Sequence, residues 1–247
     1  MKTNSLRAME ALGSLFSRER MKNFIMASEQ TGRFDANFIQ SYSQAGEDIA
    51  LSSFIDLDVQ GRYIDIGAYH PNRFSVTRLL YTKGWCGVNV DANKYLIDKF
   101  HEWRPRDINI CAAIGQLPEY ELSILSKRAL SSVVHENIEA AKKLGFITVE
   151  RRKVKGQKLR AVYDTYLPNE KCNILSLDIE GNELDALESM EFTTLPKERF
   201  PDWILVETSP PVHKAIESKP VQALINYGYI VYAVLPMSTL LRAPNLV

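Results

Sequence analysis

The sequence predicts an α/β fold in which helices cover both faces of a mostly parallel β-sheet. Three observations lead to this prediction: apolar, β-rich runs recur along the chain, segments with helical periodicity separate them, and acidic residues end several of the runs. Regular alternation of strand and helix is typical of parallel sheets, whose crossovers are helical. With 247 residues, 45% hydrophobic and 24% charged, the chain is long enough to form one such core.

The elements follow in order from these patterns. Strands are predicted at residues 61–66, 86–91, 108–114, 173–179, 202–207 and 228–234. Helices are predicted near residues 74–82, 94–102, 157–166, 182–190 and 212–226.

Two parts of the chain depart from simple alternation. The stretch between the third and fourth strands is too long for one crossover, and residues 120–125 and 146–149 predict extra strands within it. We expect this insertion, residues 116–156, to help shape a substrate pocket. Residues 239–244 are predicted to return as an antiparallel edge strand.

The first forty residues differ from the rest, so we expect a helical lead-in over residues 1–40 and one domain over residues 41–247. Leu12, Leu15 and Phe16 recur at helical spacing. The spacing predicts a helix that packs on the domain or on a second subunit, which would make the protein a homo-oligomer. No apolar run there is long enough for a membrane span, and no signal peptide is expected.

Charge and cysteine content narrow the function. The chain carries 30 basic and 30 acidic residues, so no overall field favours nucleic acid or an anionic membrane. The three cysteines, Cys86, Cys111 and Cys172, lack CxxC spacing. This pattern predicts free thiols in a reducing cytoplasm rather than a zinc site or disulfides.

Two acidic strand ends indicate a nucleoside cofactor. Asp65 precedes a turn at Gly67, and Asp91 ends the next strand. In an open α/β sheet the ligand lies beyond the carboxyl ends of the strands, where Asp91 would accept hydrogen bonds from the ribose hydroxyls. The turn after Asp65 has too few glycines for a pyrophosphate, and the chain lacks a P-loop. S-adenosylmethionine fits what remains, and its sulfonium cation suits a nearby carboxylate.

Several ordered motifs carry a resemblance to a known family. They are Ser43-Gln44, Gly46-Glu47-Asp48, Asp65-Ile66-Gly67-Ala68-Tyr69-His70-Pro71, Ser75-Val76-Thr77, Gly84-Trp85, Arg104-Pro105-Arg106-Asp107-Ile108-Asn109 and Asp178-Ile179-Glu180-Gly181. Over residues 41–232 the chain resembles the FkbM family of S-adenosylmethionine-dependent methyltransferases. Members often have an acid-proline pattern after the second strand, where this chain reads Asp91-Ala92-Asn93-Lys94.

This resemblance implies a Rossmann-like class I methyltransferase fold of seven strands with the last one antiparallel. It also implies O-methylation of a sugar, a polysaccharide precursor or a secondary metabolite. On this basis Asp65, Gly67 and Ala68 would line the methionine and ribose side of the cofactor, and Asp91 would hold the ribose. The adenine would lie against Ala92, Asn93, Ala112 and Ala113. Gln44 and Glu47, with Asp48, would close over the cofactor, unless the two acids serve only the first turn of a helix.

Methylation of an alcohol needs removal of its proton, and four residues are candidates for this step. In one hypothesis His70 takes the proton directly. In the other, Asp178 and Glu207, with Glu180 assisting, hold Mg²⁺, which acidifies the hydroxyl. Asp178 is the strongest candidate because an acid that ends an apolar strand has little structural reason to be there. His70 has the alternative of a turn residue that hydrogen-bonds to backbone.

Other functions remain open at this point. An N-methyltransferase acting on a peptide or amine would need less help from a base. A nicotinamide oxidoreductase would use the same Asp91 but needs a more glycine-rich first turn. A non-catalytic scaffold would leave the carboxylates at the strand ends without a compensating ligand.

Overall fold

The computed structural model describes residues 40–208 and 212–244, and the described residues from 41 onward belong to one compact unit. The predicted helical lead-in over residues 1–40 lies outside the described residues except for Gln40, so its role in oligomerisation stays a prediction. Among the described residues, no helix is both long and apolar enough to cross a membrane.

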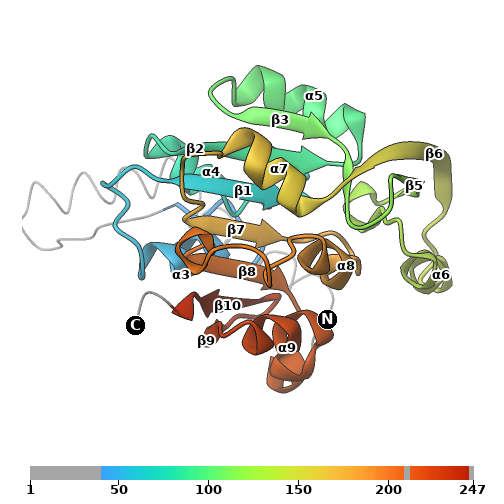
Figure 1. The fold of residues 1–247 in the computed structure, drawn as a ribbon. Helices are drawn as coiled ribbons and strands as arrows, with labels where there is room; N and C mark the ends of the chain where they lie inside the picture. Colours follow the sequence, from blue (N-terminus) through green and yellow to red (C-terminus); the bar gives the residue numbers. More distant parts are fainter. Residues whose placement is uncertain (1–39, 209–211, 245–247) are drawn as a thin grey trace, which may run out of the picture. The chain divides into compact units, whose positions relative to one another are not determined.

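A seven-stranded sheet forms the centre of this unit (Figure 1). Its strands, in spatial order, are β3 (Ile108–Cys111), β2 (Cys86–Asp91), β1 (Arg62–Ile66), β7 (Ile174–Leu177), β8 (Trp203–Glu207), β10 (Ser238–Arg242) and β9 (Ile230–Val234). Neighbours are parallel from β3 to β8, whereas β10 runs antiparallel to both β8 and β9. The predicted Rossmann-like, mostly parallel sheet with an antiparallel last strand is therefore confirmed.

The last strand corrects one expectation. Residues 239–244 were expected at an edge of the sheet, but β10 lies between β8 and β9, and β9 forms the edge. Both faces of β10 are accordingly buried, because its first four residues, Ser-Thr-Leu-Leu, are all buried. An internal strand needs partners on both sides, and β9 supplies the second.

Helices cover both faces of the sheet, as predicted. They are α3 (Glu47–Ser52), α4 (Arg78–Thr82) and α5 (Lys94–Trp103) on one face, and α7 (Leu159–Tyr166), α8 (Glu183–Glu188) and α9 (Lys219–Asn226) on the other. Three short 3₁₀ helices, Arg128–Leu130, Lys197–Arg199 and Val212–Glu217, complete the connections. The helix predicted over 212–226 is thus divided, and Pro220 lies in the first turn of α9, where its missing N–H costs nothing.

Alternate residues of β1 serve the two apolar cores. Ile64 and Ile66 pack with α7, α8 and α9, while Tyr63 packs with Leu51 of α3 and Leu80 of α4. This period of two follows from the pleat of a strand. It places Asp65 on the same face as Tyr63, away from Ile64 and Ile66.

The insertion forms a separate small sheet beside the carboxyl ends of the parallel strands (Figure 1). Its strands β4 (Ala113–Ile114), β6 (Thr148–Gln157) and β5 (Glu119–Leu125) lie in the order β4-β6-β5, with β5 and β6 antiparallel. Helix α6 (His135–Lys143) connects β5 to β6. The strand expected at 120–125 is present in β5, whereas the one expected at 146–149 begins only at Thr148 and extends to Gln157 as β6.

Candidate functional site

A cavity opens to solvent beyond the carboxyl ends of the parallel strands. Nine of the residues singled out from the sequence line it: Gln44, Gly67, Asp91, Ala92, Asn93, Ala112, Ala113, Asp178 and Glu180. The insertion contributes the opposite wall through Leu122, Ala129, Ser131, Ser132 and Val133.

Asp91 ends β2 with its carboxylate fixed by the backbone around it. One oxygen accepts a hydrogen bond from the N–H of Tyr69 at 3.0 Å, and the other accepts from the N–H of Asn93 at 2.7 Å. Asn93 in turn caps α5 by accepting from the N–H of Tyr95. Burial raises the pKa of Asp91 to about 6, against the effect of these two hydrogen bonds. The carboxylate keeps further lone pairs for two ribose hydroxyls.

Gly67 lets two strand ends approach closely. It has a φ of 80°, and a Cβ at this position would lie 1.7 Å from the backbone oxygen of Asp178. The N–H of Gly67 donates to Val90, and the N–H of Asp178 donates to Ile66. Only glycine fits between these backbones. Because it has no side chain, the ends of β1, β2 and β7 can approach one another at one end of the cavity.

Asp65 does not line the cavity but belongs to a buried polar row. In register across the sheet, Ser176 of β7, Asp65 of β1 and Asn89 of β2 lie side by side. The carboxylate of Asp65 accepts from the hydroxyl of Thr77 at 2.6 Å. Burial raises the pKa of Asp65, with the Thr77 hydrogen bond opposing. The expected contact of Asp65 with the cofactor stays a prediction that this placement does not favour.

Arg104 is the cation of this row and ties it to the loop after β1. Its guanidinium is fully buried. It donates to the backbone oxygen of Pro71 and to the hydroxyls of Ser75 and Thr77, at 2.6 to 3.0 Å. One residue therefore fixes three points of the loop that runs from β1 to α4.

The same loop carries two aromatic residues of the cavity wall in unusual conformations. Tyr69 and Phe74 both have a φ of 53°, which costs an L-residue about 1–2 kcal/mol. Their rings stack with centroids 6.2 Å apart. Such a conformation persists only where the surroundings impose it, and the bonds of Arg104 and Asp91 to this loop do so.

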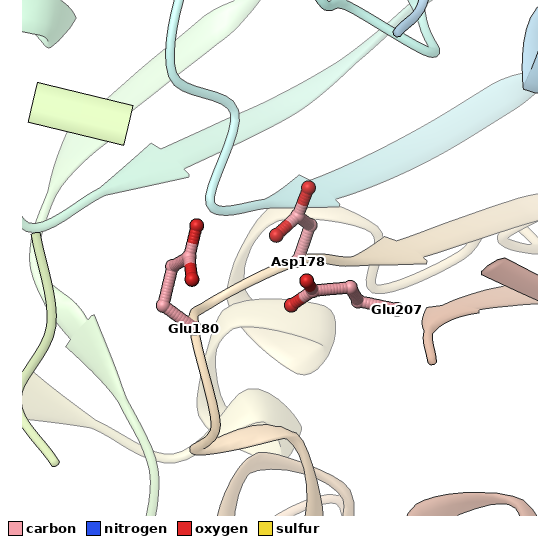
Figure 2. A group of neighbouring side chains, drawn as sticks. All are labelled: Asp178, Glu180 and Glu207. Atoms are coloured by element: carbon pink, nitrogen blue, oxygen red, sulfur yellow. The ribbon is translucent and has the colours of Figure 1, made fainter. Parts of the chain in front are cut away.

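Three carboxylates converge at the other end of the cavity (Figure 2). They come from Asp178, just after β7, Glu180 in the following turn, and Glu207 at the end of β8. Oxygens of the three side chains lie within 4.8 Å of one another. Asp178 is exposed to the cavity, while Glu180 and Glu207 are partly buried.

This convergence shifts the pKa of each acid upward. Although the Asp178 side chain is open to the cavity, the protein around it desolvates its carboxylate and raises its pKa, and its hydrogen bond with Glu207 opposes the rise. Burial and the charge of Asp178 raise the pKa of Glu207. Burial and the same charge raise the pKa of Glu180 to about 7. Three acids with raised pKa values in one place favour a cation or a proton.

The turn after Asp178 is held from inside by a fourth acid. Glu183 accepts hydrogen bonds from the N–H groups of Ile179 and Gly181 through one carboxylate oxygen, at 3.0 and 3.1 Å. Glu180, between them, has a φ of 55°. Its side chain points at Asp178 and Glu207 (Figure 2). The left-handed conformation of Glu180 was not foreseen from the sequence.

The remaining predicted site residues lie beside the cavity rather than in its wall. Nδ1 of His70 accepts from the N–H of Asn72 at 3.1 Å. Burial and the charges of Lys99 and Arg73 lower the pKa of His70 to about 4. Both features fit the turn role and give a weak base. Ala68 packs against Ile97 and Phe100 of α5.

The segment before the core supplies one wall residue and two buried acids. Gln44 lines the cavity. Glu47 and Asp48 open α3 and are both buried. Glu47 accepts from the N–H of Ala45 at 2.8 Å, and Asp48 accepts from the hydroxyls of Ser41 and Ser43, both at 2.7 Å. These acids fold the segment that carries Gln44, and the charge of Glu47 adds to the rise in the pKa of Asp178.

Comparison with known proteins gives a match to a family model. Residues 65–219 match the model of a family described as the methyltransferase FkbM domain. No curated protein matches the chain. A solved structure of a TehB-like SAM-dependent methyltransferase from Corynebacterium glutamicum is similar over 92% of this chain and 100% of its own, at 8% identity and a TM-score of 0.41.

Proposed function

This chain belongs to the FkbM family of S-adenosylmethionine-dependent methyltransferases, and from that premise we propose that it methylates a hydroxyl group of a small molecule. The acceptor class that we propose is a sugar, a polysaccharide precursor or a hydroxylated secondary metabolite. The observation that supports this choice is the convergence of Asp178, Glu180 and Glu207 on one end of the cavity.

We assign the two ends of the cavity to the two substrates. The adenosine lies against Asp91, Ala92 and Asn93 after β2, with Ala112 and Ala113 across from them. Asp91 has two anchored oxygens with free lone pairs, which suits a ribose. The sulfonium then points towards Gly67 and Asp178, where the carboxylates favour its charge.

The carboxylate cluster suits the chemistry of an alcohol. The acceptor oxygen attacks the methyl carbon as the carbon–sulfur bond breaks, which turns the sulfonium into neutral S-adenosylhomocysteine. The hydroxyl proton passes to a carboxylate of the cluster. A carboxylate with a raised pKa is a stronger base than an ordinary one, and alignment of the two substrates supplies much of the rest.

A bound divalent cation is the alternative source of activation. Oxygen ligands from Asp178 and Glu207, with Glu180, are of the hard type that Mg²⁺ prefers, and they lie close enough to approach one ion after small side-chain movements. When bound, Mg²⁺ would supply Lewis-acid chemistry that lowers the pKa of the acceptor hydroxyl. The carboxylates alone already provide a base, so the metal is not required by this arrangement.

An amine acceptor is the rival within the same family of reactions. The cluster would attract an ammonium group, but its negative charge would also raise the pKa of that group and disfavour the neutral nucleophile. A hydroxyl gains from the same charge because the cluster removes its proton. The cluster therefore favours O-methylation over N-methylation.

The first experiment measures binding of S-adenosylhomocysteine by calorimetry, with and without Mg²⁺. Methyl transfer to panels of hydroxylated sugars and of amines then follows with labelled S-adenosylmethionine. Asp178→Asn is expected to lower turnover by about 10²-fold or more while cofactor binding persists. The matched control is Asp98→Asn, an exposed acid paired with Lys94 outside the cavity, which should leave turnover unchanged.

Each outcome has a distinct meaning. Absence of cofactor binding would contradict the assignment of the cavity. Cofactor binding with methylation of amines alone would replace the hydroxyl acceptor by an amine. A strict requirement for Mg²⁺ would replace the carboxylate base by the metal.

A further inference from the structure

Two side chains of the insertion donate hydrogen bonds to the backbone of Glu180, one of the three acids of the cluster. The carbonyl oxygen of Glu180 accepts a hydrogen bond from the hydroxyl of Ser132 at 2.8 Å and a second one from the side-chain amide of Asn137. Both donors belong to the segment between β5 and β6, far from Glu180 in sequence. The contact therefore joins the insertion to the turn that carries the acid cluster.

Both donors are themselves held in place. Ser132 exchanges backbone hydrogen bonds with Ser123 of β5, at 3.0 and 3.3 Å. Its hydroxyl oxygen also accepts from the N–H of Val134 at 2.9 Å. Asn137 lies in the first turns of α6. The insertion thus presents one donor that is fixed beside β5 and one that is carried by a helix.

The backbone conformation of Glu180 requires support from neighbouring contacts. Glu180 occupies the left-handed region with a φ of 55°, and Gly181 follows with a φ of 101°. A Cβ on Gly181 would lie 2.4 Å from the amide nitrogen of Asn137, so the close approach depends on this glycine. A non-glycine residue stays in this region only where contacts impose it. Glu183 holds the N–H groups on either side of Glu180, and the insertion holds its carbonyl.

We propose that Ser132 and Asn137 are positioning residues that hold Glu180 in its left-handed conformation and so direct its carboxylate into the acid cluster. Without the two donors the turn relaxes to negative φ, and the carboxylate swings away from Asp178 and Glu207. The proposal rests on the proposed function, because it assigns the cluster to the sulfonium end of the cavity. On this proposal the insertion does more than line the cavity. It also determines how much negative charge lies close to the sulfonium and the acceptor hydroxyl.

The test compares the affinities of a cationic and a neutral cofactor. S-adenosylmethionine carries the sulfonium charge and S-adenosylhomocysteine does not, so the ratio of their dissociation constants reports the carboxylates near the sulfur. Calorimetry at pH 8 gives this ratio for the wild type, Glu180→Gln, Asn137→Ala, Ser132→Ala and the double variant Asn137→Ala/Glu180→Gln. Ser126→Ala is the matched control, because its hydroxyl oxygen accepts from Ile147 within the same insertion and does not touch Glu180.

We expect the variants of Glu180, Asn137 and Ser132 all to lose part of the preference for S-adenosylmethionine over S-adenosylhomocysteine. Glu180→Gln lowers the preference for the cation by about tenfold, which corresponds to about 1.4 kcal/mol. Asn137→Ala and Ser132→Ala each lower it by a large part of that factor, and the double variant loses no more than Glu180→Gln alone, since both changes act through one carboxylate. In each of these variants the loss of affinity for S-adenosylmethionine exceeds any loss of affinity for S-adenosylhomocysteine, and Ser126→Ala preserves the preference.

Several results would overturn the proposal. These are a wild-type preference in both donor variants, strictly additive losses in the double variant, or no effect of Glu180→Gln. In all three cases binding of S-adenosylhomocysteine would leave the proposed function intact, whereas its failure to bind the wild type would remove both. Asn137→Asp, which keeps the shape but replaces the amide donor by a carboxylate, provides a second variant if Asn137→Ala does not fold.

Discussion

Gly67 is the residue on which the geometry of the cavity depends most directly. A side chain there would overlap the backbone of Asp178, so β1 and β7 would have to separate exactly where the acid cluster begins. Its conformation, with positive φ, adds a second penalty for any other residue. The position thus combines two requirements that only glycine meets.

Gly67→Ala is expected to lower the free energy of unfolding by about 3 kcal/mol and to abolish binding of S-adenosylhomocysteine. Gly46→Ala separates the two penalties, because Gly46 has a φ of 85° but nothing within 4 Å of its Cβ position. Conformational strain alone should cost that variant about 1 kcal/mol. Denaturant titrations give both values, and equal losses in the two variants would contradict the overlap with Asp178.

Asp91 predicts a pH dependence of cofactor binding. Its pKa of about 6 lies above the ordinary value because of burial, so the free carboxyl is protonated below pH 6. Hydrogen bonds from the ribose favour the ionised form. Below pH 6 a proton must therefore leave on binding, and the dissociation constant of S-adenosylhomocysteine should rise by up to about tenfold for each pH unit.

Calorimetry between pH 5 and 8 measures this dependence, and buffers of different ionisation enthalpy reveal the released proton. Asp91→Ala should bind at least about tenfold more weakly at pH 8, where the wild-type carboxylate is fully ionised. A dissociation constant that does not change between pH 5 and 8 would exclude Asp91 as the ribose ligand.

The fate of single residues shows which sequence signals are informative. Asp91, Asp178 and Glu207 each end a strand, and the rule that ligands lie beyond the carboxyl ends was enough to bring them to one region. Asp65 lies within a run that is apolar on both sides, so the sequence does not reveal that it faces the helices α3, α4 and α5. The positive φ of Glu180 depends on Ser132 and Asn137, which no local pattern connects to it.

At the scale of elements, Arg104 links the sheet to the loop between β1 and α4. Its donors satisfy a backbone carbonyl and two buried hydroxyls. The Arg104-Pro105 motif of the sequence therefore serves the shape of the cavity rather than contact with a ligand. Arg104 fixes Pro71, Ser75 and Thr77, and in this way it also limits the conformations of Tyr69 and Phe74 in the same loop.

Arg104→Met is expected to lower the free energy of unfolding by about 3 kcal/mol, because it leaves Asp65 and several acceptors buried without their cation. The loop should loosen, and affinity for S-adenosylhomocysteine should fall with it. Arg73→Met, at an exposed position of the same loop, should change stability by less than about 0.5 kcal/mol. Thermal unfolding measures the change in stability, and calorimetry measures the affinity for S-adenosylhomocysteine. Full cofactor affinity in a folded Arg104→Met variant would contradict this role of the loop.

Elements were predictable from the sequence to the extent that their signals were local. The parallel strands and most helices follow from periodicity. The place of β10 does not, because the order of strands in a sheet depends on pairing between distant segments, and the Ser-Thr-Leu-Leu sequence fits an edge as well as an interior position.

At the scale of the whole molecule, the acid cluster makes stability depend on pH in an unusual direction. The carboxyls of Glu180 and of the Asp178–Glu207 pair have raised pKa values in the folded protein, whereas in the unfolded chain they ionise near pH 4. Between about pH 6.5 and 8 the folded state binds more protons than the unfolded state. Its free energy of unfolding should therefore fall as the pH rises.

Thermal unfolding of the ligand-free protein is expected to show a lower midpoint at pH 8 than at pH 6.5. S-adenosylmethionine should raise the midpoint more at pH 8, since its cation offsets the ionised cluster. Glu180→Gln removes one of the titrating groups and should flatten the profile. A midpoint that rises steadily from pH 6.5 to 8 in the wild type would show that the cluster does not carry the pKa values assigned to it.

The position of β10 has a consequence for the order in which the chain becomes structured. β10 comes later in sequence than every other described strand, yet it occupies the slot between β8 and β9 (Figure 1). As the chain leaves the ribosome, β1, β2, β3, β7 and β8 can assemble while one side of β8 remains unpaired. The half of the sheet that surrounds the cavity is therefore complete before β9 has a neighbour, and synthesis of the final strand joins the two.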